Sequence, residues 1–349
     1  MAKKNICILF GGVSSEHDVS IMSVRTVLEN IDREKYDITT IGITKQGQWY
    51  LFEGDLPSDK WQEEAPCKAI ISPDRAHKCV LKFTENGVEK IKIDAVYPVL
   101  HGKNGEDGTI QGLCAVAGIP CIGSGVIGSC VCMDKCIAKV LFKNAGIPVT
   151  DWVEYRKGDT IDYEEIEAKL GYPCFIKPPN AGSSVGVTKA YNRKELEGGI
   201  KLALSHDYKV LIEEAINPRE IECSVWGNYV PAVAENPGEI KPAKDFYDFE
   251  AKYEDENSAL MIPSPIDKET RDKIKEYAVL AYKVAECRGF SRVDFFVSRD
   301  DGKIYLNEIN TLPGFTSISM YPKLWGNQGI SIKDVISRHI DLAFELGVE

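Results

Sequence analysis

The chain is built from short apolar segments that end in glycine or polar turns and alternate with amphipathic stretches. The first of these segments, NICILF at residues 5–10, is followed at once by two glycines. In the stretch after them, Ile21, Val24 and Leu28 recur at the spacing of one helix face. A strand, a glycine turn and a helix in this order open an α/β sheet. This feature constrains the fold more than any other part of the chain.

The same alternation continues to the end of the chain, apart from residues 45–91, where no clear periodicity is found. Apolar segments predict strands at residues 35–44, 92–102, 173–178, 187–192, 209–216, 222–227, 291–298 and 303–310. Helical spacing predicts helices at residues 133–144, 194–206 and 271–289 and from Ser331 onward. Because 349 residues are too many for one ordinary core, we expect two or three domains of the α/β class, with α+β parts.

The formal net charge of −11 limits the classes of partner. Because binding to nucleic acid needs a basic surface, a general nucleic-acid binder is excluded, whereas a local group of lysines can still hold a small anionic substrate. The first apolar segment is too short for a signal peptide, and no stretch approaches the ~20 apolar residues that span a bilayer. We therefore expect a cytoplasmic protein that does not associate with membranes.

The eleven cysteines are scattered through apolar segments. In a reducing compartment such cysteines are buried thiols rather than disulfides. The segment CVCMDKC, with Cys130, Cys132 and Cys136, could be read as a metal site, but it has no C-x2-C pair and no second pair to complete one. The sequence therefore favours free thiols over a zinc centre.

Polar side chains end two strands in the last third of the chain. Arg292 and Asp294 share a face of one strand, and strict alternation puts Glu308 and Asn310 on the face opposite Ile309 in the other. If the strands are neighbours, Asp294, Glu308 and Asn310 offer oxygen ligands of the kind that Mg²⁺ binds while it keeps water and phosphate on its other positions. A solvated sheet face explains the pattern equally well, so both interpretations stay open here.

Two lysines and a glycine–serine loop indicate a site for phosphate. Lys177 lies at the end of an apolar strand, and Lys135 lies near a predicted helix start. The loop NAGSSVG at residues 180–186 follows Lys177 and offers backbone N–H groups that can contact phosphate oxygens. It does not have the pattern of a Walker loop. The alternatives are a simple hairpin for the loop and an acidic partner for each lysine.

Three further side chains lie at or after the ends of predicted strands. His101 ends the strand at residues 92–102 and is followed by a glycine-rich loop, at the strand end where open α/β sheets bind their ligands. Glu213 lies near the end of a later strand and Glu220 follows it, and either glutamate can bind ribose hydroxyls or face water. The glycines around His101 favour a functional role for it over a structural one.

Seven segments, in this order, resemble the D-alanine–D-alanine ligases of the ATP-grasp superfamily: GGVSSEHDVS, LHGKNGEDGTIQG, GSGVIGSCVCMDK, FIKPPNAGSSVGVTK, FYDFEAKY, SRVDFF and NEINTLPGFTSISMYPKL. The resemblance covers nearly the whole chain and is far more specific than any one segment. It implies a three-domain ATP-grasp architecture with a Rossmann-like N-terminal domain. The implied domains are residues 1–123 for substrate binding, residues 124–213 as the central ATP-grasp lid, and residues 214–349 for catalysis.

The resemblance also implies a reaction. Such ligases phosphorylate the carboxylate of one D-alanine with ATP, and the amine of a second D-alanine then attacks the acyl phosphate, which gives the dipeptide for peptidoglycan synthesis. ATP is implied as a substrate, together with Mg²⁺ or Mn²⁺, two ions in all, and a homodimer. The implied metal ligands are Asp294, Glu308 and Asn310.

Carried over position by position, the resemblance gives roles to the remaining residues. The implied ATP-binding residues are Lys135, Lys177, Ser183, Ser184, Glu213 and Glu220. The implied catalytic residues are Glu16, His101, Ser183, Tyr253, Arg292 and Gly314, with Arg292 and the Gly314 N–H as an oxyanion hole. The implied substrate-binding residues are Tyr247, Lys252, Ser319 and Met320, and residues 246–253 are implied to form an ω-loop that excludes water.

Three alternatives were weighed against this function. D-alanine–D-serine ligases have the same fold but often carry Arg where this chain has Met320, an apolar residue that suits a methyl group better than a hydroxyl. A nucleotide-binding relative without turnover has no need of Arg292 and Gly314. A Rossmann dehydrogenase is disfavoured because the opening turn GGVSSE lacks G-x-G-x-x-G. Two departures from the family pattern, Phe249 and Ile318, are apolar and concern fine specificity.

Overall fold

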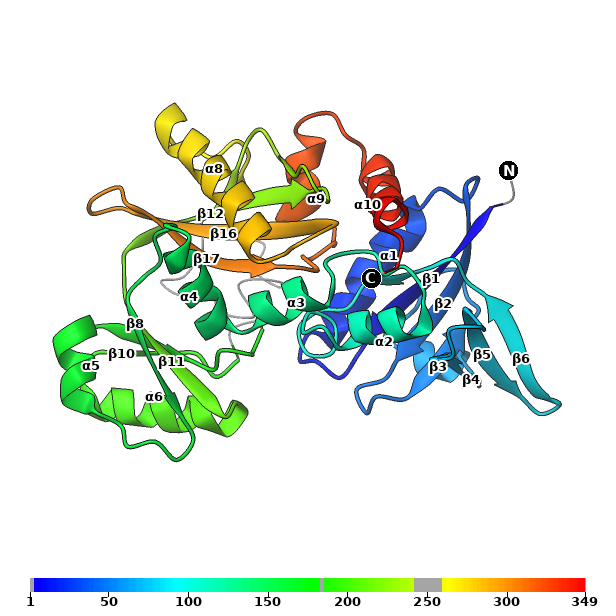
Figure 1. The fold of residues 1–349 in the computed structure, drawn as a ribbon, viewed down its shortest axis with the longest axis horizontal. Coiled ribbons are helices and arrows are strands. Elements are labelled where there is room, and N and C mark those ends of the chain that lie inside the picture. Colours follow the sequence, from blue (N-terminus) through cyan, green and yellow to red (C-terminus); the bar gives the residue numbers. More distant parts are fainter. Residues whose placement is uncertain (1–2, 183–184, 242–258, 349) are drawn as a thin grey trace.

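The computed structural model describes residues 3–182, 185–241 and 259–348 and arranges them around three β-sheets (Figure 1). Each sheet is formed by strands that follow one another in the sequence, and helices cover the sheets. The α/β class with α+β parts, predicted from the sequence, is confirmed.

The first sheet has a parallel centre that is extended on one side by antiparallel strands. Its strands, in the order β6-β5-β4-β3-β2-β1-β7, are β1 (Lys4–Gly11), β2 (Tyr36–Ile43), β3 (Trp49–Phe52), β4 (Cys67–Ile71), β5 (Cys79–Thr84), β6 (Gly87–Lys92) and β7 (Ala95–Pro98). Only β1 with β2 and β1 with β7 pair in parallel. Its helices are α1 (His17–Asn30), the short 3-10 helix η1 (Trp61–Glu64) and α2 (Thr109–Ala117).

The opening strand, turn and helix are confirmed by β1 and α1, but the expectation of an irregular stretch at residues 45–91 is wrong. That stretch holds strands β3 to β6. Its outermost strand, β6, escaped detection because it is almost entirely exposed and therefore shows no alternation between buried and exposed residues. The local signal for a hairpin is the dipeptide Asn86-Gly87, and Gly87 has a φ of 126° between β5 and β6.

The second sheet is small and antiparallel. Its strands, in the order β10-β9-β11-β8, are β8 (Trp152–Arg156), β9 (Cys174–Lys177), β10 (Thr188–Ala190) and β11 (Lys209–Glu214). The helices α5 (Tyr163–Leu170) and α6 (Arg193–His206) lie along one side of it (Figure 1). Its apolar residues form a cluster that is drawn entirely from residues 153–212.

The third sheet is antiparallel and carries helices on both faces. Its strands are β12 (Pro218–Trp226), β13 (Ala232–Val233), β14 (Gly238–Lys241), β15 (Ala259–Met261), β16 (Phe290–Ser298) and β17 (Ile304–Asn310), in the order β15-β14-β12-β16-β17 with β13 beside β12. The helices of this part are α3 (Val126–Met133), α4 (Lys135–Asn144), α8 (Lys268–Val284), α9 (Met320–Gly326) and α10 (Ile332–Leu346). Residues of α4 and α8 share one hydrophobic cluster with β12, β16 and β17.

A helix that was not predicted precedes a predicted one. The helix expected at residues 133–144 is α4, and it is preceded by α3, from which it is separated by Asp134. The backbone of Asp134 is extended, with φ −85° and ψ 97°, and its carboxylate accepts the backbone N–H groups of Cys136 and Ile137. This N-cap ends one helix and starts the next. Both helices pack against the third sheet, and the domain boundaries given above stay a prediction.

Strand β17 does not alternate strictly. Asp294 of β16 pairs with Glu308, whereas the next residue, Phe295, pairs with Leu306, so Asn307 is an extra residue in β17. As a result Leu306 and Ile309 both lie in the hydrophobic cluster beneath α8. Glu308 and Asn310 do share a face, as predicted. The bulge places them on the side away from Leu306, whereas strict alternation would have turned them toward the side of Leu306.

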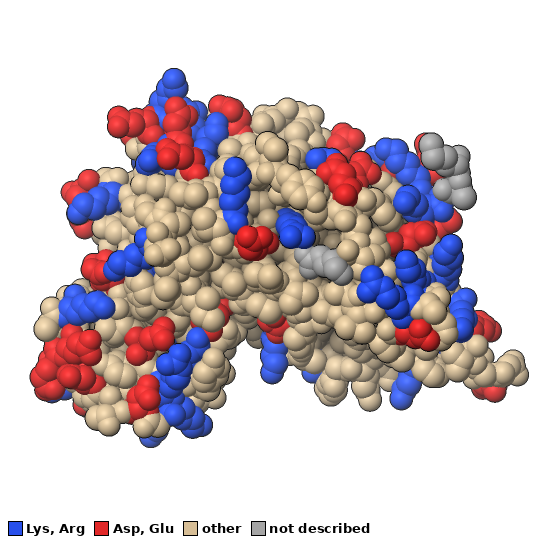
Figure 2. All heavy atoms as spheres, viewed as in Figure 1, with Lys and Arg blue, Asp and Glu red and all other residues tan. Residues whose placement is uncertain are grey.

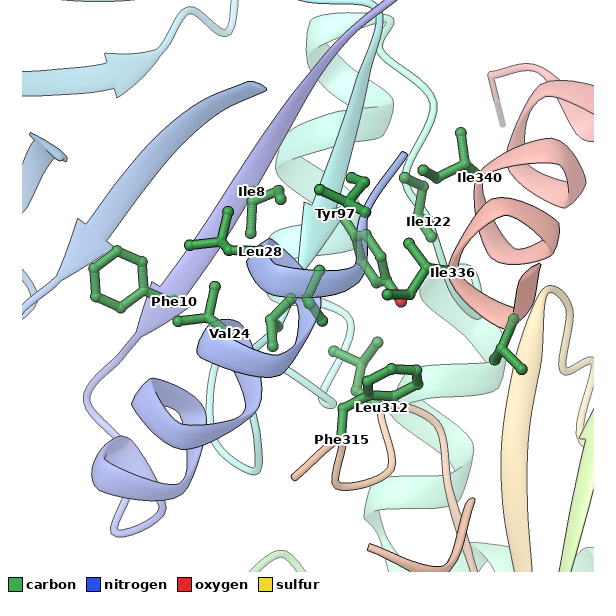
Figure 3. Packing of buried hydrophobic residues seen from close by; sticks show 14 of the residues in the cluster. Ile8, Phe10, Val24, Leu28, Tyr97, Ile122, Leu312, Phe315, Ile336 and Ile340 are labelled. Carbon is green, nitrogen blue, oxygen red and sulfur yellow. The ribbon is translucent and has the colours of Figure 1, made fainter. Parts of the chain in front are cut away.

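A single hydrophobic cluster joins the first and third sheets. Figure 3 shows Ile8 and Phe10 of β1 and Val24 of α1 packed in the same cluster as Ile336 of α10. The cluster also contains Phe315, from the segment after β17. The predicted final helix is confirmed, and the Ser331 side chain caps it by accepting the backbone N–H of Asp334. The first and third sheets are therefore held together by apolar burial.

The surface agrees with the charge argument from composition. On the face shown in Figure 2, acidic and basic side chains are interspersed, and no broad basic area is seen. Within the described part of the chain, no helix combines the length and apolar character that crossing a membrane requires.

Candidate active site

A cavity of about 660 Å³ lies where the three sheets meet. It contains every predicted site residue that the structure describes: Glu16, His101, Lys135, Lys177, Glu213, Glu220, Arg292, Asp294, Glu308, Asn310, Gly314, Ser319 and Met320. They come from all three sheets and from the loops between them. Its volume falls in the range expected of a site for small ligands.

The predicted metal ligands end two neighbouring strands. β16 and β17 pair so that Asp294 lies opposite Glu308 and Arg292 lies opposite Asn310. The Asn310 side chain donates a hydrogen bond to Asp294 Oδ2 at 2.9 Å. The bulge described above is what places Glu308 and Asn310 on the cavity side. Asp294, Glu308 and Asn310 therefore form one group of oxygen-bearing side chains at the mouth of this sheet.

Arg292 is surrounded by carboxylates. Its Nε and one terminal nitrogen each donate to an oxygen of Asp294 at 2.7 Å, and its Nε also lies 3.0 Å from Glu222 Oε2. Burial opposes the charge of the guanidinium, but Asp294 and Glu222 outweigh it, so the pKa of Arg292 is raised well above its usual value. Arg292 is thus a permanently charged, fixed donor group at the cavity wall.

Three lysines and Glu213 form a second charged group. Glu213 is 5% exposed and pairs with Lys139 at 2.6 Å and with Lys177. Burial raises the pKa of the Glu213 carboxyl, but the two lysines outweigh it and bring the pKa down to about 2. Lys135, the first residue of α4, lies 3.1 Å from Glu308 and donates to the carbonyl of Ala181 at 3.3 Å. Cationic groups thus line the cavity between the second and third sheets.

Lys139 was not identified from the sequence. It is 2% exposed and donates to both oxygens of Thr150, at 3.0 Å and 2.7 Å, in addition to its pairing with Glu213. The signal was its spacing: Lys135 and Lys139 are four residues apart in one helix and therefore lie on the same face.

Glu106 is the second residue that the sequence reasoning missed. It lies in the loop after His101, and its carboxylate accepts the backbone N–H of Gly102 at 2.9 Å and that of Leu312 at 2.9 Å. His101 contacts the carbonyl of the same Leu312 through Nδ1 at 3.0 Å. Desolvation, together with the nearby charge of Glu16, raises the pKa of Glu106 to about 7. The glutamate within LHGKNGEDG therefore ties the first sheet to the segment that carries Gly314.

Glu16 lies where two glycine-containing loops approach each other. A Cβ atom on Gly102 would come within 2.7 Å of Glu16 Oε2, and one on Gly182 would collide with the same oxygen. The absence of a side chain at both positions lets the backbone come this close to Glu16. Since Gly182 belongs to the loop between β9 and β10, Glu16 is the point at which the first sheet touches the loop of the second.

Gly314 and Ser319 are direct neighbours. A Cβ atom on Gly314 would lie 2.9 Å from Ser319 Oγ, and Ser319 Oγ accepts the backbone N–H of Thr316 at 2.9 Å. Met320 starts α9, is 2% exposed and packs against Gly238 of β14, where any Cβ would collide with its sulfur. This end of the cavity has a polar rim with an apolar wall behind it.

Five predicted site residues, Ser183, Ser184, Tyr247, Lys252 and Tyr253, lie outside the described residues, as does the ω-loop at residues 246–253. Their roles stay predictions from the resemblance.

The oxygen-bearing group of Asp294, Glu308 and Asn310 fits a magnesium ion. Two carboxylates and a carboxamide are the hard donors that Mg²⁺ binds, and the pairing of β16 with β17 brings them together at the cavity. Among the described residues, no group of three or more His, Cys, Asp and Glu side chains is placed to hold a metal ion on its own. This agrees with a cation that takes its other ligands from water and substrate phosphates.

Comparison with known proteins identifies the family. The model described as "D-ala D-ala ligase N-terminus" matches residues 5–124, and the one described as "D-ala D-ala ligase C-terminus" matches residues 141–341. The chain belongs to the D-alanine–D-alanine ligase family. One relative, a D-alanine–D-alanine ligase of Ruminiclostridium cellulolyticum, is 49% identical over 363 aligned residues, which cover 99% of this chain and 96% of that protein.

Solved structures of the D-alanine–D-alanine ligase family have the same fold. The VanG D-Ala:D-Ser ligase from Enterococcus faecalis superposes with a TM-score of 0.88 at 41% identity, over 98% of this chain and 100% of that one. The D-alanine–D-alanine ligase from Coxiella burnetii superposes with a TM-score of 0.85 at 31% identity, over 99% of this chain and 96% of that one. The ATP-grasp architecture implied by the sequence is therefore confirmed.

Proposed function

We propose that this protein joins two D-alanine molecules to D-alanyl-D-alanine with ATP, through a D-alanyl phosphate, for peptidoglycan synthesis. One observation supports the proposal above the others. The cavity is lined by Lys135 and Lys177, by the oxygen-bearing group on β16 and β17, and by Arg292 and Gly314. A carboxylate that attacks a triphosphate must overcome the repulsion between two anions, and this combination of groups supplies the positive charge that the attack needs.

In this proposal the nucleotide lies between the second and third sheets. Lys135 and Lys177 bind its phosphates together with Ser183 and Ser184, and the acidic residues Glu213 and Glu220 bind on the nucleoside side. The buried pairing of Glu213 with Lys139 and Lys177 gives it a further task, because it fixes the position of Lys177, which lines the cavity. Lys177 is then positioned before the nucleotide arrives.

Asp294, Glu308 and Asn310 would hold the divalent cations, two Mg²⁺ or Mn²⁺ ions in our proposal. When bound, such ions neutralise the phosphate charge and polarise the transferred phosphoryl group. Arg292 and the N–H of Gly314 stabilise the negative oxygen that develops when the second amine attacks the acyl phosphate. Arg292 is suited to this because its carboxylate partners keep it charged and fix its direction.

The amino acids bind at the junction of all three sheets. Glu16 receives the ammonium group of the first D-alanine and, with Ser183 and Tyr253, closes the site against water. Ser319 and Lys252 bind the carboxylate of the second D-alanine, with Tyr247 beside them, and the side chain of Met320 lies against its methyl group. His101 positions the second substrate through its contact with Leu312. We also propose a homodimer in the cytoplasm.

Purified protein incubated with ATP, Mg²⁺ and each pair of D-amino acids tests the proposal, with the products resolved by mass. We expect D-alanyl-D-alanine and ADP from D-alanine alone. In Glu308→Ala the rate of dipeptide synthesis should fall about a hundredfold or more, because the carboxylate opposite Asp294, a proposed ligand of the divalent cation, is lost. The control Glu345→Ala, an exposed partner of Arg338, should retain the rate. An unchanged rate in Glu308→Ala contradicts the proposal.

A D-alanine–D-serine ligase is the second candidate, because the VanG structure with which this chain superposes at a TM-score of 0.88 is a D-Ala:D-Ser ligase. Equal concentrations of D-alanine and D-serine in one reaction separate the two. Met320, buried in the cavity wall, favours the methyl group. A predominance of D-alanyl-D-serine at neutral pH would select the second candidate.

A further inference from the structure

The proposed metal ligands already have cationic partners within this chain. Glu308 Oε2 lies 3.1 Å from Lys135 Nζ, and both oxygens of Asp294 accept from Arg292 at 2.7 Å. Asn310 donates to Asp294 as well. A divalent cation that approaches these oxygens therefore meets two positive side chains, and one of them has to give way.

The two cations are held differently. Arg292 is on the same strand as Asp294, two residues before it, and also pairs with Glu222, so it keeps a carboxylate partner whatever happens at Asp294. Lys135 comes from α4, an element with no backbone pairing to β17. Its ammonium group is held by Glu308 and by one carbonyl oxygen, that of Ala181. Lys135 is therefore the cation that is able to move.

Lys135 lies close to the part of the cavity where a second anionic partner can bind. Ala181 lies in the loop that follows Lys177, and Lys135 lines the same cavity as Lys177. The ammonium group of Lys135 lies 3.1 Å from a carboxylate oxygen of Glu308, and a lysine ammonium group binds a phosphate as well as a carboxylate.

We propose that Lys135 stands in for the divalent cation at Glu308 until nucleotide binds, and that it then exchanges the carboxylate for a phosphate. This inference rests on the proposed function. Two positive charges repel each other at one carboxylate unless phosphate oxygens lie between them. The nucleotide therefore brings the partner that Lys135 needs in order to release Glu308. Free Mg²⁺ or Mn²⁺ should bind poorly to the protein alone, and metal and nucleotide should enter together.

A purely structural role for Lys135, as a tie between α4 and β17, makes a different prediction. The side chains of Lys135 and Glu308 are 15% and 20% exposed, so their pairing is partly removed from solvent. If it were only a tie, its loss would weaken the fold and would not improve metal binding. If Lys135 occupies the place of the metal, its loss should make Mn²⁺ bind more tightly.

The test measures binding of Mn²⁺ alone, without nucleotide, by electron paramagnetic resonance on purified full-length protein. We expect Lys135→Met to bind Mn²⁺ about tenfold more tightly than the original protein, because one competing cation is removed from the carboxylate. Lys135→Gln, which can still donate to Ala181, should give the same gain. Lys135→Arg keeps the charge and should bind as weakly as the original protein.

Two controls assign the effect to this site. Lys143→Met removes a lysine from the same helix whose partner is the exposed Asp151, and it should leave Mn²⁺ binding unchanged. The double variant Lys135→Met with Glu308→Gln should lose the gain. Thermal unfolding of each variant checks that it is folded.

The inference is overturned if neither Lys135→Met nor Lys135→Gln binds Mn²⁺ more tightly than the original protein. It is also overturned if the double variant retains the gain, since the metal would then be bound elsewhere. Synthesis of dipeptide by the original protein is measured separately. If the original protein makes dipeptide but the Lys135 variants bind Mn²⁺ no more tightly than it does, the proposed role of Lys135 is disproved and the proposed function is retained.

Discussion

The first and second sheets are attached to the rest of the molecule by different forces. The first shares one large hydrophobic cluster with α9 and α10 on the third sheet (Figure 3). The second keeps its apolar cluster within residues 153–212 and contacts α4 through charged groups, namely Lys209 with Asp134 and Glu213 with Lys139. An apolar interface has no competitor in solution, whereas a lysine that holds a carboxylate can also hold a phosphate. The attachment of the second sheet is therefore the one that a nucleotide can change.

The largest effect is expected from shortening a buried side chain in the hydrophobic cluster that the first and third sheets share. Ile336 of α10 is fully buried there, and Ile336→Ala should lower the free energy of unfolding by about 2–5 kcal/mol. Because the cluster joins two sheets, amide exchange should accelerate in both the first and the third. Ile212→Ala, at an equally buried position of the second sheet, is the matched control and should accelerate exchange mainly within residues 152–214. If both variants accelerated amide exchange equally in all three sheets, the proposed difference in attachment between the first and second sheets would be contradicted.

A somewhat smaller effect is expected from breaking the buried charge pair. The side chains of Lys209 and Asp134 are 3% and 9% exposed, so Lys209→Met leaves an unpaired carboxylate and should cost about 3 kcal/mol. The second sheet should loosen against α4 while the first sheet keeps its protection, as followed by amide exchange. Lys273→Met, in an exposed pair with Glu276, should change the stability by less than about 0.5 kcal/mol. Protection of the second sheet that matches the original protein would speak against an ionic attachment.

Glu106 tests the polar part of the junction between the first and third sheets. Glu106→Gln removes one of two acceptors for Gly102 and Leu312, and we expect about a tenfold loss in kcat/KM at pH 8. The original protein should lose activity as the pH falls through about 7, where Glu106 gains a proton and one acceptor is weakened. The profile of Glu106→Gln should be flat across that range. A profile unchanged by the substitution would assign the inflection to another group.

The same carboxyl affects stability with a definite sign. Burial raises its pKa from the usual 4.5 to about 7 in the folded protein, so the folded state holds the proton more tightly than the unfolded chain does. Glu106 therefore destabilises the fold increasingly as the pH rises from about 4.5 to about 7 and by a constant amount above that. Urea unfolding at pH 5 and pH 8 should show a smaller difference for Glu106→Gln than for the original protein.

The smallest effects are expected from the removal of helix caps, one on α10, which belongs to the shared cluster, and one on α5, which covers the second sheet. Ser331→Ala at the start of α10 and Asp162→Ala at the start of α5 each remove one acceptor for a backbone N–H and should cost about 1 kcal/mol. The loss at Ser331 should appear in global urea unfolding, since α10 belongs to the shared cluster. The loss at Asp162 should appear as faster local exchange in α5. The reverse assignment would contradict the division into strongly and weakly attached parts.

Periodicity in the sequence predicted the elements that bury one face. The opening strand and helix, α8 and α10 were found because apolar residues recur along each of them. Strands β3 to β6 were missed because they are short, four to six residues each, and β6 is exposed on nearly every residue. The break at Asp134 was missed for a different reason: a capping carboxylate inside an apolar stretch looks like an ordinary polar position.

The candidate site was predictable in composition but not in geometry. Asp294, Glu308 and Asn310 were identified as one oxygen-bearing group from strand spacing, and the family resemblance supplied the other roles. The pairings inside the cavity were out of reach, because Lys135 and Glu308 are distant in the sequence and meet only when α4 packs beside β17. Glu106 was overlooked since its partners are backbone N–H groups, one of them on Leu312, and these leave no mark in the side-chain pattern.

The extra residue in β17 separates two sets of demands on one short strand. Leu306, which precedes Asn307, packs in the hydrophobic cluster beneath α8. Glu308 and Asn310, which follow Asn307, line the cavity. Substitutions in one half of the strand therefore leave the side chains of the other half on the faces that they already occupy. Shortening the strand by that single position would rotate the carboxylate into the apolar interior and expose an isoleucine to the substrate, so chain length here is as strictly fixed as any side chain.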